Sequence, residues 1–198
     1  MTEALKGYAR ANQGTVITPF ILGGAMSPVT MPAAIAQAHA ETLVGVALTQ
    51  LVRPGSSAVY GNFLTTMDLK SGAPTFGTAE SSLATFAVGQ MARRLGLPFR
   101  AGGHYTASKV ADAQAMQESV DSMYPAILAG ANFMHQAAGW LEGGLVIGYE
   151  KFILDCDRLG MLHRMFEGLT IDENSLASSA FKENSPGENF LGTQHTAE

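Results

Sequence analysis

Cysteine and charged residues are both scarce in this sequence of 198 residues. Cys156 is the only cysteine, so no disulfide can form within the chain, and the ten methionines are typical of a reducing compartment. Charged residues make up 15% of the chain, well below the roughly 25% of an average soluble domain. We therefore expect part of the surface to be covered by another domain or chain, and we predict a homo-oligomer.

Clustered positive charge and long apolar runs are also missing. The net charge is −5, with 12 Lys and Arg residues that are nowhere grouped, which argues against a nucleic-acid or anionic membrane partner. The apolar run Val16–Met26 is interrupted by Pro19 and is shorter than the ~20 residues that a membrane span needs. We expect a globular cytoplasmic chain with neither a nucleic-acid nor a membrane partner.

Several catalytic signatures are absent as well. The chain has no Walker A sequence, no GxGxxG, HExxH or CxxC motif, and no GxSxG nucleophile elbow. Its five histidines and one cysteine do not have the spacing of a zinc site. We therefore predict no metal bound by the chain itself, and the sequence leaves the catalytic residues unassigned.

The sequence does contain a repeated alternation of short apolar runs and longer helical patterns, in a chain that is 46% hydrophobic. The expected strands are Thr15–Leu22, Ser57–Phe63, Pro98–His104 and Ala131–Ala138. The expected helices are Thr30–Arg53, Glu80–Leu95, Lys109–Leu128 and Gly148–Glu167. Strands that alternate with helices predict a parallel sheet, which is either half of a (β/α)8 barrel or a small open α/β sheet.

Local signals mark the ends of these helices and of the domain. Thr78 and Gly96 are expected to cap the second helix, whereas Pro125 predicts a kink or two separate helices in the third. The capping-box pattern that begins at Thr170 predicts a short helix through Phe181. From these patterns we expect a domain over residues 1–182 and a polar tail over residues 183–198.

Polar residues follow the predicted strands, where α/β proteins place their sites. His104 and His135 lie at or near strand ends, and Glu80 begins a helix after a loop. His135 has an equally simple interpretation as a hydrogen-bonded core histidine, and Glu80 as an acidic residue in the first turn of a helix. For each of these two residues, the structural interpretation remains an alternative to a role in binding.

Aromatic residues gather near the same strand ends: Phe20, Tyr60, Phe63, Phe76, Tyr105 and Trp140. Aromatic residues at such positions are usually part of a core. Several rings beside a carboxylate would also suit a quaternary ammonium ligand, because a ring face attracts a cation that cannot donate hydrogen bonds.

Arg100 is the least expected residue inside a strand, because a guanidinium is rarely buried without a partner. We predict that Arg100 pairs with Glu80 and that both face one cavity. The candidate substrate-binding residues are Phe20, Tyr60, Phe63, Glu80, Arg100, His104 and His135.

Longer stretches of the chain resemble the trimethylamine methyltransferase family. They include Thr18–Thr30 (TPFILGGAMSPVT), Gly72–Glu80 (GAPTFGTAE), Leu97–Arg100 (LPFR), Ala137–Gly144 (AAGWLEGG) and Phe190–Thr196 (FLGTQHT). The resemblance implies a TIM-type (β/α)8 barrel, of which these residues look like the C-terminal part with about four βα units. No residue here is written as pyrrolysine, so the chain is most similar to the non-pyrrolysine branch of the family, whose substrates are quaternary amines such as betaines.

The same resemblance implies a reaction and its partners. A methyl group would move from a small methylated amine to the cobalt of a separate corrinoid protein, so the chain itself would bind no cofactor directly. The alternative hypothesis is a non-catalytic half-barrel that pairs with another chain or another half-barrel, because an open half-barrel exposes its strand edges.

Overall fold

The computed structural model describes residues 1–198, which form two compact units, Met1–Arg158 and Leu159–Glu198. The helices of the first unit are α1 (Thr2–Arg10), α2 (Met31–Val52), α3 (Ala79–Arg94), α4 (Ala113–Leu128) and the beginning of α5 (Tyr149–Glu167). Its strands are β1 (Thr15–Ile17), β2 (Phe20–Gly23), β3 (Ala58–Gly61), β4 (Phe63–Met67), β5 (Pro74–Thr75), β6 (Phe99–Gly102), β7 (Phe133–His135), β8 (Trp140–Leu141) and β9 (Val146–Ile147).

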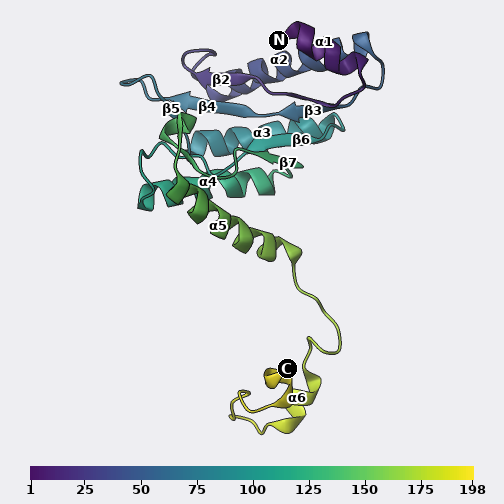
Figure 1. Cartoon of the computed structure of the whole chain (residues 1–198), viewed down its shortest axis with the longest axis vertical. Coiled ribbons are helices and arrows are strands. Elements are labelled where there is room, and N and C mark those ends of the chain that lie inside the picture. The colour runs from purple at the N-terminus through teal and green to yellow at the C-terminus, as the bar shows by residue number, and fades with distance from the viewer. The chain divides into compact units, whose positions relative to one another are not determined.

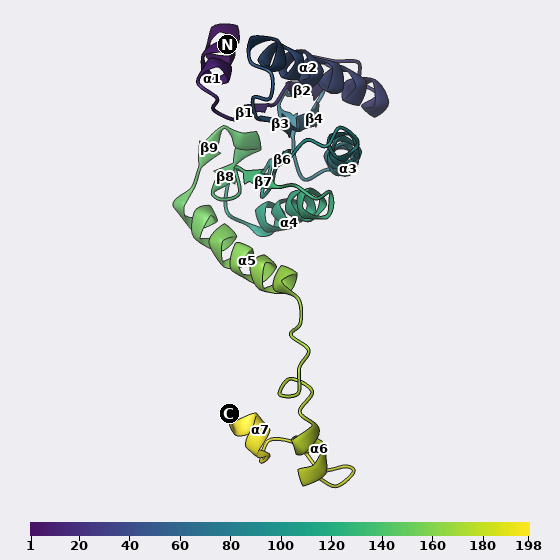
Figure 2. The same ribbon diagram turned by 90° about the vertical axis from the view of Figure 1, so that its right-hand side faces the viewer.

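The main sheet has the strand order β1-β3-β6-β7, and every pairing in it is parallel. Strands that follow one another along the chain are therefore neighbours, with α2, α3 and α4 in the connections between them. The three helices lie on the same side of these strands (Figure 2). The predicted mixed α/β fold with a parallel sheet is confirmed, and the sheet is wound in a single direction.

The core lies between the sheet and these helices. Tyr60 of β3 and Phe99 and Ala101 of β6 point toward the helices, because alternate residues of a strand face the same side. Val88 of α3 and Ala126 of α4 pack against them, and all five side chains are almost completely buried. Figure 1 shows α3 and α4 beside β6 and β7.

The opposite face of the sheet is partly open. Val16 of β1 and Phe133 of β7 belong to this face, and 45% and 48% of their surfaces are exposed. Both strands also lie at the edges of the sheet, since β1 pairs only with β3 and β7 only with β6. The apolar residues of these edge strands therefore meet solvent instead of a second layer.

Two expected strands are interrupted. Thr15–Leu22 forms β1 and β2, with Thr18 and Pro19 between them, and Ser57–Phe63 forms β3 and the beginning of β4. Proline has no backbone N–H for the ladder, which explains the first break. Among the elements that were not expected from the sequence are α1 and the short antiparallel strands β5, β8 and β9.

Of the two outcomes expected at Pro125, a kink or two separate helices, the second is wrong, because α4 is a single helix that contains Pro125 in its last turn. Proline removes one helical N–H and so leaves the carbonyl oxygen four residues earlier without its usual donor. That oxygen belongs to Asp121, and the hydroxyl of Ser82 on α3 donates to it at 3.0 Å. A tertiary hydrogen bond thus replaces the missing helical one.

The second unit, Leu159–Glu198, contains the short helices α6 (Ser178–Glu183) and α7 (Gln194–Ala197). Thr193 caps α7, and the rings of Phe181 and Phe190 meet edge to face at 5.3 Å. The capping-box pattern at Thr170 does not begin a helix, since α6 starts only at Ser178. The expected division into residues 1–182 and 183–198 stays a prediction. None of the helices is both long enough and apolar enough to cross a membrane.

Candidate active site

The open face of the sheet carries polar and aromatic side chains on its two last strands. Arg100 on β6 is in register with Phe133 on β7, and Gly102 is in register with His135. Glycine is required at position 102, because a Cβ atom there would collide with the Tyr105 hydroxyl. The period of two along both strands therefore places Arg100, Phe133 and His135 on the same face.

A recess of about 320 Å³ lies over this part of the sheet. Its lining residues come from β1, β4, β6 and β7 and from the segments that follow β1 and β7, and they are Val16, Thr18, Phe63, Arg100, Phe133, His135 and Gln136. This volume is at the lower end of the range of small-molecule sites. The recess is open to one side, as expected for a partly uncovered sheet.

Arg100 is the charged group of this recess, and only 3% of its surface is exposed. Its Nη1 donates to the carbonyl oxygen of Asn62 at 2.7 Å, and its Nη2 donates to His135 Nδ1 at 2.9 Å and to Gln136 Oε1 at 2.7 Å. Burial lowers the pKa of Arg100, and Tyr105 opposes this shift. Arg100 forms no ion pair, so neutral groups alone surround its charge.

The protonation state of His135 follows from its contact with Arg100. A guanidinium can only donate, so Nδ1 of His135 must accept and the proton of the neutral ring must be on Nε2. Burial lowers the pKa of His135, and the charge of Arg100 lowers it further. The ring is partly exposed and stacks on Phe133 with 5.9 Å between the centroids. His135 therefore offers a neutral N–H donor at the recess.

An aromatic cluster extends from the recess toward β2 and β5. Phe63 is its centre, with ring centroids of Phe20, Tyr105 and Phe76 at 5.0, 5.6 and 5.7 Å. The guanidinium carbon of Arg100 lies 5.5 Å from the Phe63 centroid, which is a cation–π distance. The Tyr105 hydroxyl donates to Gln136 Oε1, and burial raises the pKa of Tyr105. The rings therefore support the position of Arg100.

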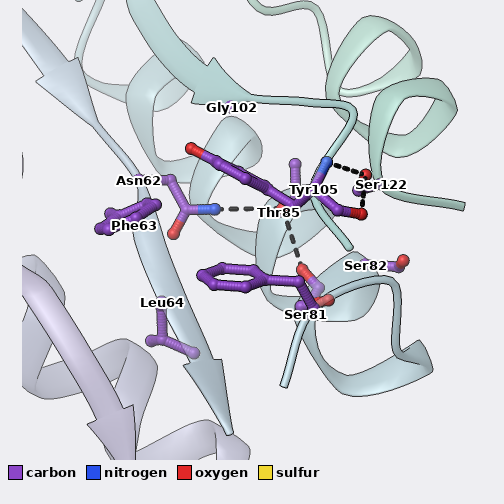
Figure 3. Close-up of a pocket in the computed structure, with 10 residues that line it drawn as sticks. Asn62, Phe63, Leu64, Ser81, Ser82, Thr85, Gly102, Tyr105 and Ser122 are labelled. Carbon is purple, nitrogen blue, oxygen red and sulfur yellow. Dashed lines mark hydrogen bonds between the residues drawn. The ribbon is translucent and has the colours of Figure 1, made fainter. Parts of the chain in front are cut away.

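A second pocket lies behind this cluster (Figure 3). It has a volume of only about 20 Å³, which is room for a single water molecule. Asn62 Nδ2 donates to Thr85 Oγ1 at 3.0 Å, while its buried Oδ1 has no partner within the protein. Tyr105 is fixed on the other side by Ser122, whose hydroxyl accepts from its backbone N–H. This pocket is too small for an organic substrate.

The backbone is strained just after both strands that carry the recess. His104 follows β6 with φ at +52°, and Gln136 follows β7 with φ at +58°. Residues other than glycine rarely adopt such angles, and they do so where surrounding contacts hold them. Without this positive φ, the chain at Gln136 would continue the strand. The strained backbone instead turns the Gln136 side chain toward Arg100 and Tyr105.

A buried ion pair lies beside the same two loops. Lys151 Nζ contacts Asp155 Oδ2 at 2.5 Å one turn along α5, and both side chains are completely buried. Asp155 also accepts from the backbone N–H of Gly139 at 2.8 Å. His104 Nδ1 donates to the Ala137 oxygen at 2.7 Å and lies 3.6 Å from Asp155. This cluster fastens the loops after β6 and β7 to α5.

Burial sets the ionisation of this cluster. It lowers the pKa of His104, although the nearby Asp155 opposes the shift, so the ring is neutral with its proton on Nδ1. Burial also lowers the pKa of Lys151, against the attraction of Asp155. No group of three or more His, Cys, Asp or Glu side chains is arranged to hold a metal ion.

The structure brings together four of the seven candidate residues, namely Phe20, Phe63, Arg100 and His135. Tyr60 instead faces the helices, where its hydroxyl meets His39 Nδ1 at 2.8 Å and burial raises its pKa to about 12. His104 belongs to the buried Lys151 cluster. Glu80 is exposed in the first turn of α3.

The predicted pairing of Arg100 with Glu80 is wrong. Arg100 is buried as expected, but Asn62, His135 and Gln136 are its partners. Glu80 lies outside the recess, because the loop before α3 carries it to the exposed N-terminus of that helix. Glu80 was chosen as the partner because it is the carboxylate among the candidate residues, but its place in the first turn of α3 keeps it away from Arg100.

Sequence reasoning missed Phe133 and Gln136 at the recess and the pair of Lys151 and Asp155. Phe133 could have been found, since it precedes His135 by two residues and must share its face. The spacing of four between Lys151 and Asp155 predicts neighbours on a helix, but not their burial. The position of Gln136 depends on its positive φ, which no local pattern indicates. Trp140 lies in β8 outside the recess.

Comparison with known proteins adds to this geometry. Residues 1–198 match the family described as trimethylamine methyltransferase (MTTB). Glycine betaine methyltransferase of Desulfitobacterium hafniense (strain Y51) is 36% identical over 196 residues, which are 99% of this chain and 41% of that protein. Trimethylamine methyltransferase MttB of Methanosarcina thermophila is 34% identical over 193 residues, which are 97% of this chain and 39% of that protein.

This chain therefore spans about two fifths of the length of the curated relatives that it matches. The matched region includes β1 to β9 and all of the residues around the recess. Because the family match extends over the whole chain, the protein belongs to the trimethylamine methyltransferase family.

Proposed function

We propose that this chain is part of a methyltransferase that takes a methyl group from a methylated or quaternary amine of the trimethylamine or betaine type and transfers it to the cobalt of a corrinoid protein. The observation that carries the proposal is the recess on the sheet, where aromatic rings and one buried cation meet in a chain of this family. The recess is the proposed amine site.

The architecture supports a TIM-type barrel as the complete fold. Four parallel strands wound in one direction with their helices on one side are what half of a (β/α)8 barrel requires. Four further strands would cover the open face and pair with the edges of β1 and β7. The recess would then lie inside the barrel instead of on an open surface.

The chemistry of a quaternary amine suits the side chains of the recess. Such a nitrogen is already positive and leaves as a neutral amine, so the reaction needs no general acid. The uncovered ring of Phe133 and the outer face of the aromatic cluster supply surfaces that attract a cation without hydrogen bonds. The work of these residues is to hold one methyl group in line with its acceptor, which is catalysis by positioning.

The corrinoid would remain on its own protein. A recess of about 320 Å³ accommodates a small amine, whereas a corrinoid ring is far larger. When bound nearby, the corrinoid supplies a nucleophilic cobalt that accepts the methyl group. The open side of the recess is where such a partner would approach, and the residues of this chain would orient the amine toward it.

The test is methylation of a reduced corrinoid protein, followed by its visible absorbance. The chain is supplied together with a second polypeptide that comprises the residues which its longer relatives carry outside the matched region. We expect methylation with glycine betaine or trimethylamine. If neither amine supports methylation while a full-length relative does so in parallel, the proposal is wrong.

A second candidate function is that of a half-barrel that pairs with another copy. The observation that favours it is the pair of free edges at β1 and β7 beside an open apolar face. Two copies would supply eight strands and cover both faces. Sedimentation velocity distinguishes the two candidates, since a stable monomer at micromolar concentration contradicts the pairing and leaves the amine site unaffected.

A further inference from the structure

Helix α5 begins with charged side chains inside and apolar side chains outside. Lys151 and Asp155 are completely buried, whereas 45% of Phe152, 66% of Ile153 and 41% of Leu154 is exposed. An apolar pair of similar size is often at least as stable as a buried ion pair, because charges are costly to remove from water. Stability alone therefore does not explain why this end of α5 turns its ion pair toward the loops after β6 and β7.

The ion pair is one part of a closed ring of contacts that joins these two loops. Lys151 Nζ donates to the His104 carbonyl oxygen at 3.5 Å, and His104 Nδ1 donates to the Ala137 oxygen at 2.7 Å. Asp155 Oδ2 accepts from the Gly139 N–H at 2.8 Å and contacts Lys151 Nζ. The loop after β7 is therefore held at two points, Ala137 and Gly139.

Gln136 directly precedes the first of these two points and connects the ring of contacts to the recess. Its φ of +58° is a conformation that a residue other than glycine keeps only where surrounding contacts hold it. In that conformation its Oε1 accepts from Arg100 Nη2 at 2.7 Å and from the Tyr105 hydroxyl. The same Nη2 donates to His135 Nδ1 at 2.9 Å. If the loop were released, Gln136 would relax toward the extended strand, and Arg100 would lose a partner beside His135.

We propose that Lys151 and Asp155 are positioning residues of the recess. Through the loop after β7 they hold Gln136 in its strained conformation, and Gln136 holds Arg100 against His135. Neither Lys151 nor Asp155 lines the recess, so they act on its geometry and not on a ligand. This geometry is tested on the 198-residue chain itself, whereas its importance for methyl transfer rests on the proposed function.

Two double variants isolate the hydrogen bond that the Gly139 N–H donates to Asp155. Lys151→Met/Asp155→Leu removes both charges and also the acceptor of this hydrogen bond. Lys151→Met/Asp155→Asn is the matched control, because asparagine is neutral and has the branched shape of leucine but keeps an acceptor oxygen. Neither variant leaves a buried charge without a counter-ion, and the contact of Lys151 with the His104 oxygen is lost in both.

The pH titration of the His135 ring, followed by NMR, reports the position of Arg100. Burial lowers the pKa of His135, and the charge of Arg100 lowers it further. In Lys151→Met/Asp155→Leu the titration midpoint should rise toward 6.5, because the guanidinium no longer stays beside the ring. In Lys151→Met/Asp155→Asn it should remain that of the unaltered chain. A pair that only stabilises the fold would leave the midpoint equal in all three folded proteins, and that result overturns the proposal.

Gln136→Ala tests the same coupling from the other end without any change to the ion pair. It decides the question if Lys151→Met/Asp155→Leu does not fold. The Gly139 amide should exchange with deuterium about tenfold faster in Gln136→Ala, because the loop loses the hydrogen bonds of one anchor. Gln117→Ala on the exposed side of α4 is the control and should leave that rate unchanged. An unchanged rate in Gln136→Ala overturns the proposal.

The methylation assay connects this geometry to the proposed function. At saturating amine, Lys151→Met/Asp155→Leu should transfer methyl groups about tenfold to hundredfold more slowly than Lys151→Met/Asp155→Asn, since misplaced side chains position the amine poorly. Equal rates overturn the importance of the pair for methyl transfer. If the unaltered chain also fails to methylate cobalt while a full-length relative succeeds, the proposed function is wrong, and the His135 titration still decides the positioning role.

Discussion

Arg100 on β6 and Lys151 on α5 are both buried cations, but their surroundings differ. Lys151 has a carboxylate partner at 2.5 Å, and that carboxylate is completely buried with it. Arg100 has only neutral partners, although no more than 3% of its surface is exposed. One charge is balanced within the chain and the other is not.

This difference indicates what each region does. A compensated pair at the junction of two loops and a helix holds the backbone in place, as the contact of Asp155 with Gly139 shows. Arg100 lies at an open recess and has no such counter-ion within the chain. The comparison predicts that the free energy of unfolding depends more on the pair of Lys151 and Asp155 than on Arg100.

The largest expected effect is that of Asp155→Asn. The substitution leaves Lys151 buried without a counter-ion, which typically costs about 3–5 kcal/mol in the free energy of unfolding. Urea denaturation followed by circular dichroism measures it. Asp157→Asn on the same helix is the control, because Asp157 is exposed, and it should change the value by less than about 0.5 kcal/mol. Similar losses in both variants would show that the pair of Lys151 and Asp155 is not structural.

A smaller loss is expected from Arg100→Met. The variant removes hydrogen bonds to Asn62 and Gln136, but it also removes a desolvated charge and leaves no carboxylate unpaired. We expect a decrease of about 1–2 kcal/mol in the free energy of unfolding. The same denaturation experiment applies. A loss as large as that of Asp155→Asn contradicts the comparison, since it would mean that Arg100 has a compensating partner within the chain.

Tyr105→Phe examines how the neutral partners support Arg100. The hydroxyl of Tyr105 shares Gln136 Oε1 with Arg100, and its removal leaves that oxygen with one donor. We expect a loss of about 1 kcal/mol in the free energy of unfolding. Aromatic packing with Phe76 and Phe63 is unaffected by this change. A larger loss, or altered NMR signals of β7, would show that the hydroxyl fixes the loop itself.

The smallest expected effect is on the pH dependence of stability. Burial lowers the pKa of His104 and of His135 below the usual 6.5, and Arg100 adds to the shift of His135. As the pH falls below 6.5, the unfolded chain binds protons that the folded chain does not. The free energy of unfolding should therefore decrease from pH 7 toward pH 5.

Variants of His135 at the recess and of His104 beside Lys151 show how much each histidine contributes to this pH dependence. His135→Gln and His104→Gln should each make the decrease less steep, and His104→Gln should do so more because His104 is fully buried. Equal slopes in the unaltered chain and in both variants would contradict the lowered pKa values of His104 and His135.

Much of the fold could be predicted from the sequence. The alternation of apolar runs and helical patterns located β1, β3, β6 and β7 and the helices between them, because burial of one face imposes the periods of 2 and 3.6 residues. The family was also evident from long motifs such as Gly72–Glu80. Short elements such as β5, β8 and β9 were missed, since strands of two residues carry no period.

The candidate site was predicted only in part. Arg100 and His135 were identified as unusual strand residues, and the structure places them together. The choice of Glu80 as partner failed because the sequence gives no distance between a helix N-terminus and a strand interior. The prediction that Tyr60 faces the recess is wrong for a different reason. Successive residues of a strand point to opposite sides of the sheet, and Tyr60, one residue before Gly61, points to the helix side.

The sequence by itself determined which residues alternate along each strand, and therefore that Arg100 and Gly102 share a face, as do Phe133 and His135. Only the tertiary structure decided that the two strands lie side by side in the register that brings Arg100 to His135 and Gln136. It also decided which buried cation has a carboxylate. The reason is physical: periodicity is a local property of the chain, whereas charge compensation depends on contacts between residues that are far apart in sequence.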